Sequence, residues 1–411
     1  MIYKWSKHAV AVLESGGALV ASADNWFEWS SPPCFEGITA KQICAAGKLL
    51  AILTSDNKLL ACASPENSPR DITSEVQKIF GGPVDIISVS ASYSFIIVRS
   101  LCSIGLICTR LDASDTSGLR IKETSHVLHQ ASSEIDLWIM RESEMEGVAR
   151  TSDGDLFYFG YHDHNRYGKT KWAVVPLQFH EAASIRELYC SAYYIMLLMQ
   201  DGRVYVQFRR PDHTLFSDEH EPFELVIIPN HEPISKIVIA SSDIFYIGVG
   251  GNCYHAGYLN NGWVVNPDLL QGLRGYQIEN IYTIRKDYVI QHDGLRLSIL
   301  HVAEPKSHSI FEIYRDRKAI FDHYANGSKK PRPLPFFDDK TIISIENIHG
   351  RTCFITEEGH AHWIRHIKES IEPVFTLDPF FETNPIAVPP RALAIKSASS
   401  DPREEVIGSH N

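Results

Sequence analysis

The sequence lacks the marks of several large protein classes. No stretch of its 411 residues approaches the ~18–20 consecutive apolar residues of a membrane-spanning helix. Residues 1–10 contain charges and histidine but no apolar core followed by a cleavage site, so we expect no secretory signal. Asp and Glu (50) outnumber Lys and Arg (39), and the net charge of −11 argues against a broad nucleic-acid-binding face. We therefore expect neither membrane insertion nor direct nucleic-acid binding.

Motifs for nucleotide binding and hydrolysis are also missing. The sequence has no GxxxxGKS/T, no GxSxG, no HExxH, and no GxGxxG ahead of a helix. The pairs His162/His164 and His360/His362 could begin a metal site on a strand, but neither has a matching third ligand. We therefore predict no catalytic residue, no metal and no cofactor. A catalytic site assembled from distant loops stays open as an alternative.

Paired cysteines are absent as well. The eight cysteines are scattered singly, none forms a CxxC pair, and several lie within apolar segments. Because the chain is far too long for a disulfide scaffold, we expect reduced, buried thiols in a cytoplasmic or nuclear protein.

What the sequence does contain is a repeat. Two apolar segments separated by a turn of Asp, Asn or Gly recur about every 40–65 residues. In the clearest copy, Ile195–Met199 and Val204–Val206 flank the turn Asp201-Gly202. Such turns accept positive φ angles and so favour tight hairpins. The predicted hairpins span residues 8–20, 43–61, 86–105, 147–160, 195–206, 244–254, 288–300 and 352–364.

Several hairpins carry a third apolar strand about ten residues upstream. These strands are predicted at 185–188, 234–239, 278–281 and 342–345. Three strands make up most of a four-stranded blade, and continuous apolar runs fit strands buried between blades. We predict an all-β fold, a single closed β-propeller over residues 1–400 with a polar tail at 401–411. An open β-solenoid or a two-domain sandwich is the alternative.

The two ends of the chain fit into one blade. The first hairpin has no upstream strand, and Arg391–Ser399 looks like an upstream strand without its hairpin. Together they would complete a blade and remove the open edges of the sheet. We therefore predict that N- and C-terminal strands close the ring.

The repeat resembles that of the regulator-of-chromosome-condensation family. The best match is Thr151–Gly160 followed by Asn165–Gly168, in which Tyr158-Phe159-Gly160 stands where the family has an aromatic residue, Trp and Gly. Cys190–Tyr194 would stand for the Cys-Gly-x-x-His of the family. The resemblance implies a seven-bladed propeller with ends that close as described. Because we find eight hairpins, we expect seven blades plus an inserted hairpin, or else eight blades.

Residues 303–340 break the rhythm and predict an inserted loop or hairpin. This segment is slightly basic on an acidic protein, so it could complement an acidic patch on a partner. An ordinary solvated connection is the alternative. The predicted partner-binding residues are its basic side chains, Arg315, Arg317, Lys318, Lys329, Lys330 and Arg332.

A rigid ring with two rims of loops is typical of a protein-interaction platform. We expect a monomeric, non-catalytic platform that binds a protein partner. The resemblance implies an alternative, a guanine-nucleotide exchange factor for a Ran-like small GTPase. Such a protein binds the nucleotide-free GTPase more tightly and so speeds nucleotide release. A propeller enzyme, or a propeller that inhibits a target enzyme, is a further alternative.

Overall fold

The structure of the chain is a computed structural model, which describes most of residues 2–386. The described ranges are 2–5, 8–13, 15–22, 25–31, 35–46, 48–64, 67–92, 95–111, 119–141, 146–162, 171–190, 194–208, 222–240, 243–259, 262–263, 267–284, 287–294, 296–300, 327, 330–348, 351–364 and 375–386.

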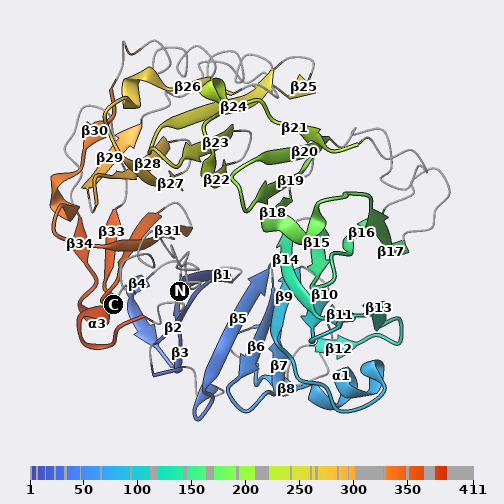
Figure 1. Ribbon diagram of the computed structural model, residues 1–411. Helices are drawn as coiled ribbons and strands as arrows, with labels where there is room; N and C mark the ends of the chain where they lie inside the picture. The colour runs from blue at the N-terminus through green and yellow to red at the C-terminus, as the bar shows by residue number, and fades with distance from the viewer. Residues whose placement is uncertain are drawn as a thin grey trace, which may run out of the picture.

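The described strands form eight sheets, which follow one another around a ring (Figure 1). Each of the eight predicted hairpins supplies the second and third strands of one sheet. The four predicted upstream strands are the innermost strands of their sheets. The all-β propeller is therefore confirmed, and its blades number eight, the second of the two predicted counts.

The first four blades cover the N-terminal half of the chain. Blade 1 contains β1 (Ile2–Trp5), β2 (His8–Val12), β3 (Ala18–Ser22) and β4 (Asn25–Ser30). Blade 2 contains β5 (Ala40–Ala46), β6 (Leu49–Thr54), β7 (Leu59–Cys62) and β8 (Arg70–Asp71), followed by helix α1 (Thr73–Phe80). Blade 3 contains β9 (Ser88–Ser92), β10 (Phe95–Arg99), β11 (Ser103–Leu111), β12 (Leu119–Ile121) and β13 (His126–Gln130). Blade 4 contains β14 (Ile135–Arg141), β15 (Glu146–Thr151), β16 (Leu156–His162) and β17 (Lys171–Leu177).

The other four blades follow the same order, with short 3-10 helices between them. Blade 5 contains β18 (Ile185–Cys190), β19 (Tyr194–Met199), β20 (Val204–Phe208) and β21 (Glu224–Leu225), between η2 (Ala182–Ser184) and η3 (Pro229–His231). Blade 6 contains β22 (Ile234–Ala240), β23 (Asp243–Gly248), β24 (Cys253–Leu259), β25 (Gly262–Trp263) and β26 (Asp268–Leu269), then η4 (Gln271–Leu273). Blade 7 contains β27 (Ile278–Ile284), β28 (Asp287–His292), β29 (Arg296–Leu300) and β30 (Arg332–Pro333), then η5 (Pro335–Phe337). Blade 8 contains β31 (Ile342–Ile348), β32 (Arg351–Thr356), β33 (Ala361–Ile364) and β34 (Thr376–Leu377), then α3 (Pro379–Thr383).

Strand β19 shows why the second strands are apolar on both faces. All of its residues are buried. Ile195, Leu197 and Met199 pack in the cluster shared with blade 4, whereas Tyr194 and its alternate neighbours pack in the cluster shared with blade 6. Because side chains alternate along a strand, a strand between two blades must be apolar at every position.

The innermost strands share one irregularity. In six blades the pairing of the first and second strands slips by one residue near the start of the first strand. In blade 5, Ile185 pairs with Met199 and Glu187 with Leu198, which leaves Arg186 as the extra residue. Bulges of this kind re-aim a side chain. Here Arg186 donates to the backbone carbonyls of Ile234 and Ser235 in the next blade.

Within the described residues, segments from both ends of the chain contribute to blade 1. Ile386 forms an antiparallel bridge with Leu13, at the place where Ile185 pairs with Met199 in blade 5, and β1 continues the same inner edge. The N–H of Ile386 also donates to the carbonyl of Gly359 in blade 8 at 3.0 Å. Residues 391–399, for which we predicted this place, lie outside the described part. Strand Ile2–Trp5 supplies the first strand of this blade, so the first hairpin belongs to a complete four-stranded sheet.

Candidate functional site

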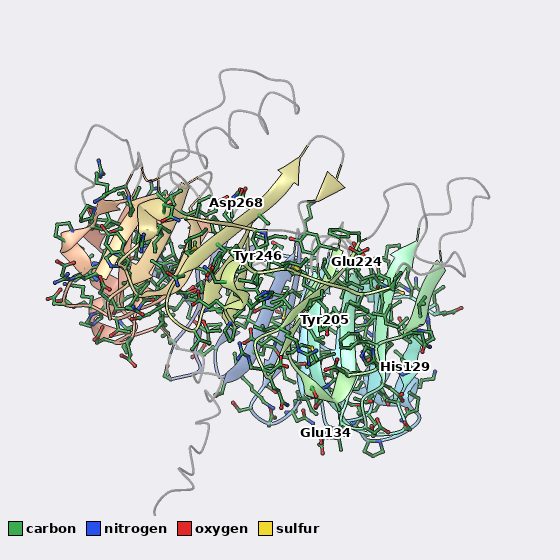
Figure 2. The ribbon with its side chains drawn as sticks, turned by 45° about the horizontal axis from the view of Figure 1, so that its top comes forward. His129, Glu134, Tyr205, Glu224, Tyr246 and Asp268 are labelled. Atoms are coloured by element: carbon green, nitrogen blue, oxygen red, sulfur yellow. The ribbon has the colours of Figure 1, made fainter. Side chains whose placement is uncertain are left out.

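The antiparallel order of the strands gives the propeller two unlike rims. In each blade the first-to-second and third-to-fourth connections lie at one rim, and the middle hairpin turn lies at the other. We call these the variable rim and the turn rim. Figure 2 shows Glu224, where β21 begins at the variable rim, and Glu134, beside β14 at the turn rim, at opposite ends of the blades.

The connections at the variable rim differ widely in length. The third and fourth strands are joined by 23–24 in blade 1, 163–170 in blade 4, 209–223 in blade 5 and 301–331 in blade 7. Connections that vary on a constant scaffold are where binding function concentrates in propellers. The variable rim is therefore the candidate functional site.

The turn rim is occupied by contacts between blades. The carbonyls of turn glycines accept from the first residues of the next inner strand, with Ala40 N donating to Gly16 O at 2.8 Å and Ile234 N to Gly202 O at 2.9 Å. Gly202 has a φ of 85°, and a Cβ added there would lie 2.7 Å from Pro233 Cβ. Backbone packed this closely leaves little freedom for loops that adapt to a partner.

The predicted partner-binding residues belong to the blade 7 connection of the variable rim. Arg315, Arg317, Lys318 and Lys329 lie outside the described residues. Lys330 is exposed, and Arg332 is half-buried in β30, where it pairs with Ile299. The last part of the predicted insertion, 332–337, is thus the fourth strand and 3-10 helix of blade 7.

Two acidic side chains are buried at the variable rim. Asp243 and Glu146 are the first residues of β23 and β15, where each second strand leaves this rim. Asp243 lies 3.0 Å from the Nε2 atom of His255 and accepts from the hydroxyl of Tyr288 in blade 7. Glu146 accepts from the hydroxyl of Tyr158. The network of Asp243 therefore ties blades 6 and 7 together at the rim.

Sequence reasoning missed both acids, because each is a single residue at the start of an apolar run. Aligning the hairpins by their turns would have indicated that each acid occupies a normally apolar position. Blade 5 has the buried aromatic residue Tyr194 at the equivalent position, so an acid there implies a buried partner.

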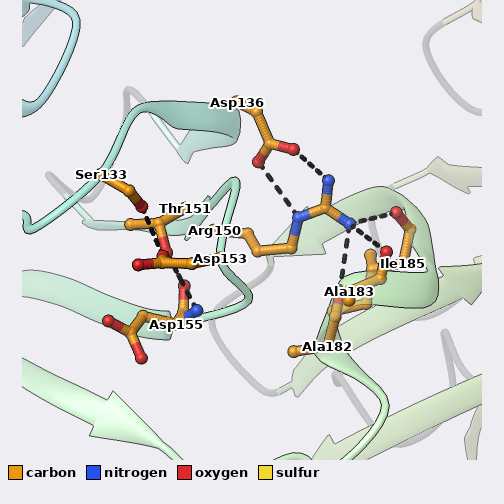
Figure 3. A network of polar contacts seen from close by, with 9 residues as sticks. All are labelled: Ser133, Asp136, Arg150, Thr151, Asp153, Asp155, Ala182, Ala183 and Ile185. Atoms are coloured by element: carbon orange, nitrogen blue, oxygen red, sulfur yellow. Dashed lines mark hydrogen bonds and ion pairs between the residues drawn. The ribbon is translucent and has the colours of Figure 1, made fainter.

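An arginine network ties blades 4 and 5 near the turn rim (Figure 3). The guanidinium of Arg150 is paired with both carboxylate oxygens of Asp136, and its Nε lies 3.1 Å from Oδ1. Its Nη1 donates to the carbonyls of Ala182, Ala183 and Ile185 at 3.1, 3.3 and 2.5 Å. One side chain therefore satisfies the backbone ahead of and at the start of β18.

A third buried acid joins the last blade to the first. Asp378 is fully buried, and its Oδ2 accepts from the indole nitrogens of Trp29 at 3.0 Å and Trp363 at 3.1 Å. Trp29 lies in blade 1 and Trp363 in blade 8, within one apolar cluster that also holds Ile386. The contact between blades 8 and 1 is thus polar as well as apolar.

The second predicted His-x-His pair does not gather ligands. His362 is only 4% exposed and neither ring nitrogen has a hydrogen-bond partner within the described residues. Its ring packs edge-on against Phe336 and Phe337. His162 ends β16, and His164 lies outside the described residues. Across the described ranges, no group of three or more His, Cys, Asp or Glu could hold a metal ion.

We predict that His362 makes the fold sensitive to acid. Burial, with a smaller contribution from Lys340, lowers its pKa to about 4, below the ~6.5 of an exposed histidine. Unfolding therefore takes up a proton as the pH falls below ~6.5, which should cost about 2 kcal/mol of folding free energy at pH 5. Urea unfolding of the protein and of His362→Phe between pH 7.5 and 5 measures this loss. Equal pH dependence of both proteins would contradict it.

Comparison with known proteins adds likeness of fold. No family model matches the sequence, and no curated protein matches it. Human WBSCR16 matches with 9% identity and a TM-score of 0.44, over 75% of this chain and 84% of that one. Yeast RCC1 (Prp20), in a complex with Kap60, matches with 9% identity and a TM-score of 0.45, over 88% and 80%. Prp20p from Saccharomyces cerevisiae, described with its binding to Gsp1p and histones, matches with 10% identity and a TM-score of 0.44, over 89% and 82%. Identities this low concern the fold alone.

Within the described ranges, no helix has the length and apolar character needed to cross a membrane.

Proposed function

We propose that this protein is a non-catalytic interaction platform that binds a protein partner with its variable rim. The observation that carries the proposal is the asymmetry of the two rims. Connections of very different lengths gather at one rim, while backbone hydrogen bonds between blades occupy the other. A rigid ring holds the ends of these connections in fixed relative positions, so one partner can contact several of them at once.

The basic residues of the blade 7 connection are the proposed contacts for an acidic patch of the partner. They are Arg315, Arg317, Lys318, Lys329 and Lys330, with Arg332 at the base of the same connection. On a chain with a net charge of −11, a local basic segment provides steering and orientation for an acidic surface.

Charge reversal tests this proposal. The rim variant replaces Arg315, Arg317 and Lys318 with Glu. The control variant replaces three exposed basic residues at the turn rim, Lys58, Lys78 and Arg274, with Glu, so that both variants carry the same net charge. We expect affinity capture with chemical crosslinking to recover a protein partner with the parent and the control, and at least tenfold less with the rim variant. If the rim variant recovers the partner and the control does not, the partner binds at the turn rim instead.

The resemblance of the repeats favours one specific form of this function, exchange of guanine nucleotides on a Ran-like small GTPase. Release of a fluorescent GDP analogue from Ran and a few other small GTPases tests it directly. Acceleration that the rim variant loses and the control keeps would establish exchange activity. No acceleration across the panel would reject exchange for those GTPases and leave the platform function.

A further inference from the structure

The outer edge of blade 5 differs from the edges of the neighbouring blades. Leu225 in β21 and Ile227 just beyond it are 47% and 56% exposed, whereas Val226 between them is buried. Alternation of this kind is that of a strand with one face on the core and one in solvent. Two large aliphatic side chains therefore project side by side from an outermost strand.

Four other blades begin a helix earlier after the fourth strand, although the strand itself ends at the equivalent residue. Val226 N donates to Val204 O, and the same bond marks the equivalent buried residue in four other blades: Ile72, Leu270, Leu334 and Asp378. In three of these blades that residue is the N-cap of α1, η4 or η5, and in blade 8 helix α3 begins at the next residue. In blade 5 the N-cap is Ile228, two residues later, with extended backbone.

The later start of the helix leaves an apolar residue exposed where those four blades have a polar residue or proline. The position of Ile227 is held by Thr73, Gln271, Pro335 and Pro379 in those four blades. Polar residues, proline and early helices are the usual protection of a sheet edge against further pairing. Blade 5 lacks this protection at Ile227.

The backbone of this edge is available for pairing. β21 is the last strand of its sheet, with Tyr205 opposite Leu225 and Val206 opposite Glu224. Because Val226 bonds inward to Val204, the N–H and C=O groups of Leu225 and Ile227 point away from the sheet. Within the described residues, no hydrogen bond reaches the backbone of either residue.

The charge at this edge indicates which kind of partner segment would bind. Glu224 is exposed at the start of the strand. A strand added here would meet negative charge at one end and the aliphatic side chains of Leu225 and Ile227 along its length. Lys or Arg at that end and alternating apolar residues thereafter complement this pattern.

We propose that the outer edge of blade 5 binds an extended segment of another protein by strand addition, with basic residues at the end that faces Glu224. Main-chain hydrogen bonds to Leu225 and Ile227 supply affinity, and the alternating apolar side chains supply selectivity. This surface lies on the side of the ring and is independent of the blade 7 connection.

Synthetic peptides test the proposal on the full chain. The probes are fluorescent heptapeptides that alternate Val, Ile, Leu, Phe or Tyr with threonine and end with two lysines, because the C-terminal end of an antiparallel strand faces the start of β21. We expect at least one probe to bind, with at least tenfold weaker binding after N-methylation of alternate backbone nitrogens, which removes donors but keeps the side chains. Replacing the lysines of the probe with glutamates should weaken binding as well.

Variants of the protein separate this surface from others. Leu225→Lys and Ile227→Lys should each weaken probe binding at least tenfold, while Leu101→Lys and Val249→Lys, at exposed apolar residues on hairpin turns, should leave it unchanged. The rim variant described above should also bind the probe normally, so failure of this proposal is distinct from failure of the rim. No binding by any probe, or binding that survives N-methylation or Ile227→Lys, would overturn it. A dimer in sedimentation velocity that Ile227→Lys dissociates would assign the edge to a second copy and also overturn it.

Discussion

Replacing Arg150 with alanine is expected to lower the free energy of unfolding by about 3 kcal/mol, because buried backbone carbonyls lose the donor that satisfies them. The change removes the partner of Asp136 and leaves the carbonyls of Ala182, Ala183 and Ile185 without their donor. These carbonyls precede and begin the inner strand of blade 5, so the loss falls on the joint between two blades. Urea unfolding, followed by circular dichroism, measures it.

Arg203 provides a matched control. It also has several partners, Asp201, Glu181 and Tyr205, but its side chain is 41% exposed. Water replaces the lost partners at such a site, so Arg203→Ala should lower the free energy of unfolding far less than Arg150→Ala does. A similar loss in both variants would mean that Arg150 stabilises the joint no more than a surface ion pair does.

Replacing Asp378 with alanine is expected to cost about 4 kcal/mol, because two buried indole N–H groups lose their acceptor. The variant weakens the joint between blades 8 and 1, which the bridge of Ile386 with Leu13 also holds. A ring opened there exposes the apolar faces of two blades, so we expect the variant to aggregate on heating. Urea unfolding and the tryptophan emission of Trp29 and Trp363 report the change.

The Asp378→Asn variant tests whether the acceptor itself matters. Its amide oxygen can still accept from the indoles, so the loss should be about 1 kcal/mol, the difference between a charged and a neutral acceptor. An equal loss in Asn and Ala variants would show that the negative charge, and not the hydrogen bonds, stabilises the closure.

The candidate site was predictable from the sequence only in part. The departure from the repeat after residue 300 indicated the longest connection, and the fold places its ends at the variable rim. The sequence did not predict where the inserted segment ends, because the strand that follows it, Arg332-Pro333, has only two residues. Proline and charge mark such a segment as a loop, and only the adjacent β29 makes it part of a sheet.

The sequence by itself determined the hairpins, but it left the number of blades open between seven and eight. Apolar runs such as Tyr194–Met199, each followed by a turn residue that accepts positive φ, are local signals, and a hairpin forms from neighbours in the chain. Their length also indicated that both faces are buried, which requires blades on either side.

Only the tertiary structure decided how the ring closes and what joins the blades. The strand Ile2–Trp5 is short and carries a lysine, so its pattern gave no signal, and its continuation by Ile386 depends on contact between the two ends of the chain. The contacts of Arg150, Asp243 and Asp378 likewise join residues from different blades. A polar residue does not identify its partner in the sequence, because burial and the geometry of the neighbouring blade select it.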